Sequence, residues 1–314
     1  MSPTRISSQA AEACVSSFRR TVTRIAGKVI LLAAVACSPQ LVELESDGVV
    51  QVPLEGIKSV VASVQEGNLR VEAVQVALDR ALVRYRVRAA GATEAEAEEC
   101  MRNIQIDHEV SPSGILRIGW HLVGARKPYC SAVVDLTVEI PATLPLEAQT
   151  QAGALEVLGN ASACRARSRS GDIRLTGTST DIVAISESGN VSIQGGQKVE
   201  GRSRSGRIRL KAKAHSIDLA SESGGVSVEL DCDENVRGSI VTQSGPVLLV
   251  YDGIAPVEIE AKSSTAGAMT LRGDFDDTQN LEGQPLWARR GRNGDKISIS
   301  TSSGSVHVEG HRRS

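Results

Sequence analysis

Serine and histidine are the side chains of this sequence with the clearest potential for chemistry. A serine nucleophile needs one particular serine beside a histidine base, and the 314 residues contain no Gly-x-Ser-x-Gly turn of the hydrolase type. The serines instead recur at regular intervals through the second half of the chain, which a structural repeat explains. The histidines are scattered, at His108, His121, His215, His307 and His311. We therefore expect no enzyme and no cofactor.

Two groups of neighbouring acids are the candidates for a metal site. They are Asp231, Asp233 and Glu234 in one segment, and Asp274, Asp276 and Asp277 in another. Carboxylates and loop carbonyls together bind Ca²⁺, but neither group has the glycine and distal glutamate of an EF-hand loop. No cysteine and histidine spacing of the zinc type occurs. We interpret both groups as solvated loop acids and expect no metal.

A repeat built around glycine runs through residues 151–314. Successive glycines are separated by 18, 18, 17, 18, 21, 22 and 37 residues, and the last spacing is close to two periods. Two apolar residues separated by one other residue follow each glycine, as Ile173 and Leu175 do, and a second such pair precedes it. Alternation of this kind predicts two short, half-buried strands in each unit. The repeat glycines are Gly153, Gly171, Gly189, Gly206, Gly224, Gly245, Gly267 and Gly304.

A unit this small cannot bury its own apolar face, so the units must stack on one another. The predicted fold is all-β, a β-solenoid or β-helix-like roll with a narrow aliphatic interior. Two residues before the glycine the charge alternates in sign, through Arg169, Glu187, Arg204 and Glu222. In a parallel stack these side chains would form a surface charge ladder. We expect the serines on both sides of this column to face inward, and the glycine to supply backbone freedom at the bend.

The composition narrows the possible partners. The chain has 35 basic and 37 acidic residues, a net charge of −2, which disfavours a nucleic-acid partner bound through bulk charge. Only 2% of the residues are aromatic, so the core must consist of small aliphatic side chains. A set of basic residues could form a patch for an acidic glycan, although interspersed acids favour a solvated face. These residues are Arg165, Arg167, Arg169, Arg202, Arg204, Arg207, Arg209 and Lys211.

The first residues are typical of an export signal. Five basic residues and one acid precede the apolar run 29–36, which is too short for a transmembrane helix of about 20 residues. The sequence Ala34-Val35-Ala36-Cys37 resembles the lipobox of bacterial lipoproteins. This resemblance implies cleavage before Cys37 and a lipid on its thiol, which would anchor the chain in a membrane. The alternative is a secretory signal cut nearby, with Cys37 as an ordinary thiol.

Four further cysteines lie in the exported part, and they can pair in three ways. Cys100 ends a helix-like segment and Cys130 precedes a strand-like one. Since a hairpin-like pair of strands separates the two, Cys100 with Cys130 is our first choice of pairing.

The chain divides into the signal at 1–37, an irregular β region at 38–150 and the repeat at 151–314, the last two being continuous with each other. Thr93 and Glu96 fit a capping box, which predicts one short helix near 93–103 that covers an end of the stack. Gly67 begins a degenerate copy of the repeat. Residues 274–296 break the repeat and are expected to form a loop or irregular coil, with Trp287 folded onto the core.

Two features together resemble the bacterial putative adhesin family of β-strand-repeat domains. One is the strand Val134–Pro141, which ends in proline, and the other is the run of Ser-Gly-x-Val/Ile repeats from Gly153 to Gly304. The resemblance spans most of residues 45–310. It implies a β-helix-like or β-roll fold on exported, often anchored proteins, and it supplies no catalytic residues.

We therefore expect a non-catalytic, lipid-anchored protein of the cell envelope, in the outer membrane or periplasm, that presents a repetitive β surface to a glycan or protein. One alternative is a structural or assembly protein of the envelope. Another is a polysaccharide-processing enzyme, which would require clustered acids on adjacent coils.

Overall fold

The computed structural model describes residues 41–124, 130–160, 162–177, 179–264, 268–279 and 285–312. The predicted signal, Cys37 and Gly267 lie outside these residues. One compact unit spans Gln40–Ser314, and its two sheets run without interruption across position 150. No helix in the described ranges has the length and apolar character that crossing a bilayer requires.

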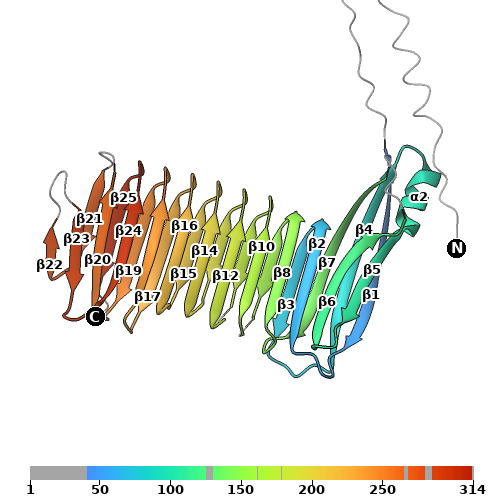
Figure 1. Ribbon diagram of the computed structural model, residues 1–314, viewed down its shortest axis with the longest axis horizontal. Helices are drawn as coiled ribbons and strands as arrows, with labels where there is room; N and C mark the ends of the chain where they lie inside the picture. Colours follow the sequence, from blue (N-terminus) through green and yellow to red (C-terminus); the bar gives the residue numbers. More distant parts are fainter. Residues whose placement is uncertain are drawn as a thin grey trace, which may run out of the picture. The chain divides into compact units, whose positions relative to one another are not determined.

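The described residues form two long sheets and the helix α2 (Glu94–Arg102). Figure 1 shows the strands lying side by side along each sheet. Sheet A has the order β1 (Val42–Pro53), β4 (Arg80–Gly91), β7 (Ser131–Pro141), β3 (Leu69–Val74), β9 (Leu155–Leu158), β11 (Ile173–Thr176), β13 (Val191–Gln194), β15 (Ile208–Ala212), β17 (Val226–Cys232), β19 (Val247–Gly253), β25 (Val306–His311), β21 (Met269–Gly273). Sheet B has the order β22 (Asp277–Gln279), β23 (Leu286–Arg290), β20 (Val257–Ser263), β24 (Asp295–Thr301), β18 (Arg237–Thr242), β16 (Ser216–Ser221), β14 (Lys198–Ser203), β12 (Asp181–Ser186), β10 (Cys164–Ser168), β8 (Leu146–Ala152), β2 (Ser59–Glu66), β6 (Ile115–Leu122), β5 (Ile104–Val110).

The repeat unit is a rung, which we define as one strand of sheet B, a tight turn that contains the repeat glycine, and one strand of sheet A. Neighbouring rungs pair in parallel and in register, so Ile173, Val191, Ile208 and Val226 are successive partners. The predicted stack of rungs is confirmed. Strands inside the stack alternate buried and more exposed residues because their side chains point in turn to the core and to solvent.

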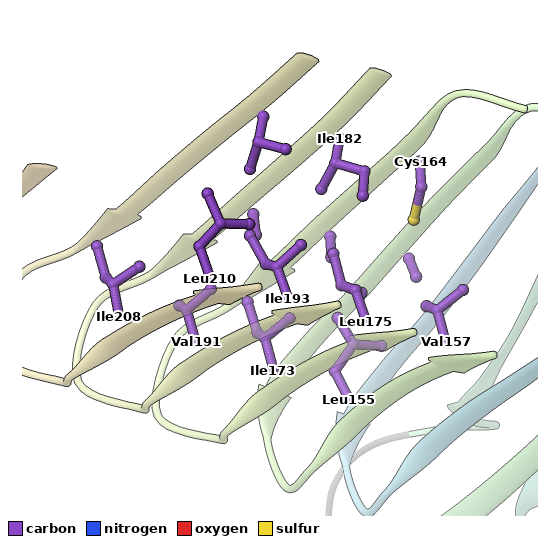
Figure 2. Close-up of a cluster of buried hydrophobic side chains, with 14 of the residues drawn as sticks. Leu155, Val157, Cys164, Ile173, Leu175, Ile182, Val191, Ile193, Ile208 and Leu210 are labelled. Carbon is purple, nitrogen blue, oxygen red and sulfur yellow. The ribbon is translucent and has the colours of Figure 1, made fainter. Parts of the chain in front are cut away.

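The core is a narrow layer between the two sheets. Figure 2 shows Leu155, Ile173, Val191 and Ile208 following one another along sheet A, with Ile182 and Cys164 opposite on sheet B. These side chains are at most 3% exposed. Small residues, mostly aliphatic, fill this narrow space.

The order of rungs in space differs from their order in the sequence at both ends. The last rung, β24 with β25, inserts between β18–β19 and β20–β21. The spacing of 37 residues before Gly304 is therefore not two periods of a sequential stack, because Gly304 lies next to Gly245. At the other end β2 with β3, the rung that contains Gly67, inserts between β6–β7 and β8–β9. The degenerate repeat at Gly67 is thus a full rung.

The helix begins with the predicted capping box. The Thr93 hydroxyl accepts a hydrogen bond from Glu96 N–H, and the Glu96 carboxylate accepts one from Thr93 N–H. The helix contacts β1, the edge strand of sheet A, and the adjacent β4, with Ala97 and Cys100 buried. It therefore covers part of an exposed sheet edge, which would otherwise invite pairing with another chain. Cys100 and Cys130 form a disulfide with a Cα–Cα distance of 5.4 Å.

The described part of 274–296, residues 274–279 and 285–296, is not the loop that the break in the repeat suggested. These residues include β22 and β23, which add antiparallel strands to the end of sheet B. Leu286 and Ala288 face the core, so the expectation for Trp287 is wrong: it lies on the outer face, half-buried beneath the Arg289 guanidinium. The register of β23 places alternate residues inward, and Trp287 falls on the outward set.

Candidate binding surface

The tight turns between the two sheets align along the stack and form what we call the corner. At Gly171, Gly189 and Gly206 the serine three residues earlier is buried, and its hydroxyl accepts a hydrogen bond from the glycine N–H. These bonds measure 2.8 Å for Ser168 and Gly171, 2.8 Å for Ser186 and Gly189, and 2.8 Å for Ser203 and Gly206. This column of serines faces inward, as predicted, and fixes the conformation of each turn.

The second column of serines is exposed, contrary to expectation. Ser170, Ser188 and Ser205 come directly before the glycine, and strict alternation does not continue through the turn. Each hydroxyl donates a hydrogen bond to a backbone carbonyl of the previous rung, as Ser188 does to Arg169 O at 3.2 Å. These serines therefore tie neighbouring turns together from the solvent side.

Close packing, rather than unusual backbone angles, explains most of the repeat glycines. Of those that the structure describes, Gly153 alone has a positive φ, 117°. At Gly189, Gly206, Gly224 and Gly245 a Cβ atom would overlap the carbonyl oxygen of the glycine one rung earlier. The expectation of backbone freedom at each bend is thus replaced by a requirement for direct backbone stacking.

The predicted charge column lies on the outer rim of the corner. Arg169 Nε is 3.6 Å from Glu187 Oε2, and Arg204 Nε is 3.3 Å from Glu222 Oε2. All four side chains are more than half exposed, so each pair contributes only about 0–1 kcal/mol to stability. A groove of about 740 Å³ follows this rim from Gln65 to Ser244, lined by the charged residues and the exposed serines.

The eight basic residues considered for a glycan patch do not form one surface. Arg165, Arg167 and Arg202 are on the outer face of sheet B, while Arg169 and Arg204 are at the corner. The remaining residues, Arg207, Arg209 and Lys211, belong to the sheet A side, in β15 or just before it. Strands that follow each other in the sequence alternate between sheets, which separates these residues in space.

Members of both acid groups contact nearby basic side chains or a histidine. Lys213 Nζ lies 3.5 Å from Asp231 and 3.4 Å from Asp233, and His215 pairs with Glu234 at 3.4 Å. Arg289 pairs with Asp277. Across the described ranges, no three His, Cys, Asp or Glu side chains converge in a way that suits a metal ion.

Cys164 and Cys232 are unpaired and buried inside the stack. Burial raises the pKa of the Cys164 thiol to about 12. Burial, together with the charge of Asp231, raises the pKa of the Cys232 thiol to about 12. Since the thiolate is the reactive form, both side chains act as small core residues.

Arg290 is a buried cation in the basic stretch Arg289-Arg290-Gly291-Arg292. It is 1% exposed and lies between the rings of Tyr251 and Phe275, at 5.4 and 5.3 Å from their centroids. Its guanidinium donates hydrogen bonds to the carbonyls of Gly253, Asp274 and His311, at the ends of β19, β21 and β25. Burial lowers the pKa of Arg290 from its usual range. Arg290 therefore joins β25 of the last rung to β19 and β21, the strands on either side of it.

A second feature missed in the sequence is a row of side chains three residues after each turn glycine, on the outer face of sheet A. Comparing the residues three positions after each repeat glycine, with Gly67 counted as a repeat glycine, would have revealed this row. The row contains Arg70, Glu156, Arg174, Ser192, Arg209 and Ser227.

The fold and the corner define a β-solenoid-like protein of paired strands with a repetitive polar surface. The chain belongs to the Toastrack DUF4097 family, whose sequence profile matches residues 78–309. A search of curated proteins found no relative that matches the chain.

Solved structures of similar fold come from bacteria. A putative adhesin from Parabacteroides distasonis is 13% identical over 84% of this chain and 97% of its own, with a TM-score of 0.50. A putative adhesin from Parabacteroides merdae is 11% identical over 84% and 95% of the two chains, with a TM-score of 0.45. One from Bacteroides fragilis is 13% identical over 87% and 98%, with a TM-score of 0.41. At this level of identity the first similarity establishes the fold alone.

Proposed function

We propose that this protein is a non-catalytic, lipid-anchored binding scaffold of the bacterial cell envelope, of the adhesin type. The observation that carries the proposal is the corner groove, because residues from successive rungs line it in register from Gln65 to Ser244. Neighbouring rungs are about 4.8 Å apart, so the groove offers repeated serine hydroxyls and alternating charges at regular intervals. A surface of this kind suits a polymer or another extended partner better than a single small molecule.

The charges in the groove support binding rather than catalysis. General acid and base catalysis on a polysaccharide needs two carboxylates that face the same bond. In the corner each glutamate has an arginine of a neighbouring rung beside it, at 3.6 Å for Glu187 and 3.3 Å for Glu222. Such pairs engage the carboxylates with cations, so they favour recognition of polar groups over proton transfer.

The anchor rests on the lipobox-like sequence that ends in Cys37. We expect the lipid on Cys37 to hold the protein in the outer membrane or at the periplasmic side of the envelope. Replacing Cys37→Ser in the full chain should move the protein from the membrane fraction to the soluble fraction. Unchanged membrane fractionation would contradict the lipid anchor.

The binding role is tested with a corner variant in which Arg169, Glu187, Arg204 and Glu222 are all replaced by Ser. A matched control removes two ion pairs on the outer face of sheet A, Arg84–Glu139 and Arg86–Glu45, by changing all four residues to Ser. Both variants keep the net charge of the wild-type protein. Purified protein without residues 1–36 is applied to a glycan array and, in parallel, to a polysaccharide depolymerisation assay.

The proposal expects selective retention that falls about tenfold in the corner variant and stays near wild type in the control. No retention of any glycan or cell surface would favour a structural role in the envelope. Release of new chain ends from a polysaccharide would contradict the non-catalytic role.

A further inference from the structure

The outer face of sheet A carries a row of alternating charges that lacks acids at two positions. The residues in order of strand pairing are Arg70, Glu156, Arg174, Ser192, Arg209 and Ser227. The first three alternate in sign. In the next two positions where the alternation would place an acid, the chain has a serine.

The first part of this row forms ion pairs. Glu156 lies between two arginines, with Oε2 2.8 Å from Arg70 Nη1 and Oε1 3.9 Å from Arg174 Nη1. Opposite charges also meet across β1, β4 and β7, where Arg84 pairs with Glu139 and Arg86 with Glu45. On this part of the face, acids of one strand neutralise arginines of the next.

The second part leaves two arginines around a small neutral residue. Ser192 is the register partner of Arg174 on one side and of Arg209 on the other. Since adjacent strands are about 4.8 Å apart, the two arginine backbones are roughly 9.6 Å apart, with only the serine hydroxyl between them. Within the described residues, Arg209 has no carboxylate at ion-pair distance, and Arg207, two residues earlier on the chain, is also exposed.

A hollow of about 260 Å³ lies at this place, lined by Arg174, Ser192, Arg207 and Arg209 together with Asp172 and Asn190. Asp172 is the one acid in the hollow. Its Oδ1 accepts hydrogen bonds from the backbone N–H and the side-chain amide of Asn190, at 2.8 and 3.1 Å. The amide of Asn190 therefore holds this carboxylate, and the hollow retains an excess of positive charge.

We propose that this hollow binds a carboxylate of an acidic polysaccharide, such as a uronic acid residue, in the position of the missing acid. This inference rests on the proposed binding function and names a second surface and a ligand class for it. Guanidinium groups recognise planar carboxylates through paired, charge-assisted hydrogen bonds. The Ser192 hydroxyl supplies a neutral group for a sugar hydroxyl. The net charge of −2 disfavours any polyanion bound through bulk charge, so the arginines of the hollow must carry the recognition.

Ser192→Glu tests the proposal directly, because it places an acid of the protein itself between Arg174 and Arg209. Arg209→Ser removes one side of the hollow. Ser300→Glu is the matched control, because it makes the same change on the outer face of sheet B. Ser300 is exposed there, and its register partner on the adjacent strand is Lys262. Binding is measured by calorimetry with polygalacturonate and with its methyl ester, which has the same backbone without the charges.

We expect polygalacturonate to bind and the methyl ester not to bind. Ser192→Glu and Arg209→Ser should each weaken binding by about tenfold, and added salt should weaken it further. Ser300→Glu should bind as the wild type does, and so should the corner variant described above. A loss in the corner variant alone would place the binding at the corner and overturn this inference without affecting the proposed function.

Three other results would also overturn it. These are equal affinity of Ser192→Glu and Ser300→Glu, equal affinity for polygalacturonate and its methyl ester, and tighter binding of polyphosphate or of anionic lipid vesicles than of polygalacturonate. If any of these results were found but a neutral glycan still bound at the corner, the proposed function as a binding scaffold would stand.

Discussion

Gly189 lies directly against Gly171 of the preceding rung, so close that a Cβ atom on Gly189 would overlap the Gly171 carbonyl oxygen. The contact joins backbone to backbone at the corner, where no flexible side chain can move aside. The same relationship links Gly206 to Gly189 and Gly224 to Gly206. The repeat glycines thus set the spacing of the whole stack.

Gly189→Ala should lower the free energy of unfolding by about 1–3 kcal/mol or more, because the added methyl group must push two rungs apart. Ser188→Ala is the neighbouring control, since it removes only the exposed hydrogen bond to Arg169 O and should lower stability by about 1 kcal/mol or less. Denaturant unfolding of both variants measures the difference. Equal stability of the two variants would contradict the close stacking.

Arg290 should be among the most sensitive single positions at the C-terminal end. Arg290→Met would leave the carbonyls of Gly253, Asp274 and His311 without their donor, which should cost about 3 kcal/mol or more in unfolding free energy. Arg289→Met is the control, because the Arg289 side chain is 42% exposed and its ion pair with Asp277 is worth about 1 kcal/mol or less. Limited proteolysis should also cut residues 286–311 first in Arg290→Met. A variant as stable as the control would exclude the role of Arg290 in holding the inserted rung.

Cys164 and Cys232 should be unreactive in the folded protein. Burial raises the pKa of the Cys164 thiol to about 12, so almost no thiolate forms at neutral pH, and solvent does not reach the sulfur. Titration with a chromogenic disulfide reagent, on protein that lacks residues 1–36 and has Cys37 replaced by Ser, should detect these two thiols only after denaturation. Rapid labelling of the native protein would indicate that the stack opens near β10 or β17.

Glu260 should make stability depend on pH in the acid range. Hydrogen bonds from Lys262 and then Lys296 lower the pKa of the Glu260 carboxyl, at Nζ–Oε distances of 2.6 and 2.5 Å. A lowered folded pKa gives stability that is fully present above the unfolded value of about 4.3 and is lost as pH falls through the folded pKa. Glu260→Gln should therefore be less stable than wild type at pH 7, and the gap should close below about pH 4.

Glu258→Gln on the same strand controls for the change in charge in that comparison. A gap between wild type and Glu260→Gln that stays constant down to low pH would contradict the ion pairs with Lys262 and Lys296.

Local patterns in the sequence were enough to predict the rung itself. Each glycine fixes a turn, the flanking aliphatic pairs give the inward positions, and Thr93 with Glu96 marks the start of the helix. Ser168 and its equivalents could be placed inward because they alternate with the exposed charges. Ser170 and its equivalents could not, since the turn puts two outward residues in succession.

The inserted rungs could not be predicted from the same patterns. Val306 with Val308 and Met269 with Leu271 offer equivalent apolar pairs, so hydrophobicity alone permits either pair to lie next to Val247 and Leu249. The deciding contacts come from Arg290, and a run of three basic residues around a glycine gives no sign that one of them is buried. The row that contains Ser192 begins with Arg70. Arg70 joins this row only because β3 lies next to β9 in space, which the sequence order does not reveal.

The most direct test of the stack is the proximity of Val241 in β18 and Ser300 in β24. These residues are 59 positions apart in the sequence but are register partners in adjacent parallel strands. With Cα atoms about 4.8 Å apart, cysteines at both positions lie within the range for a disulfide or a short thiol cross-link. We predict that Val241→Cys/Ser300→Cys forms an intramolecular cross-link under mild oxidation, identified by mass spectrometry. A folded double variant that fails to form this cross-link would contradict the account of the stack.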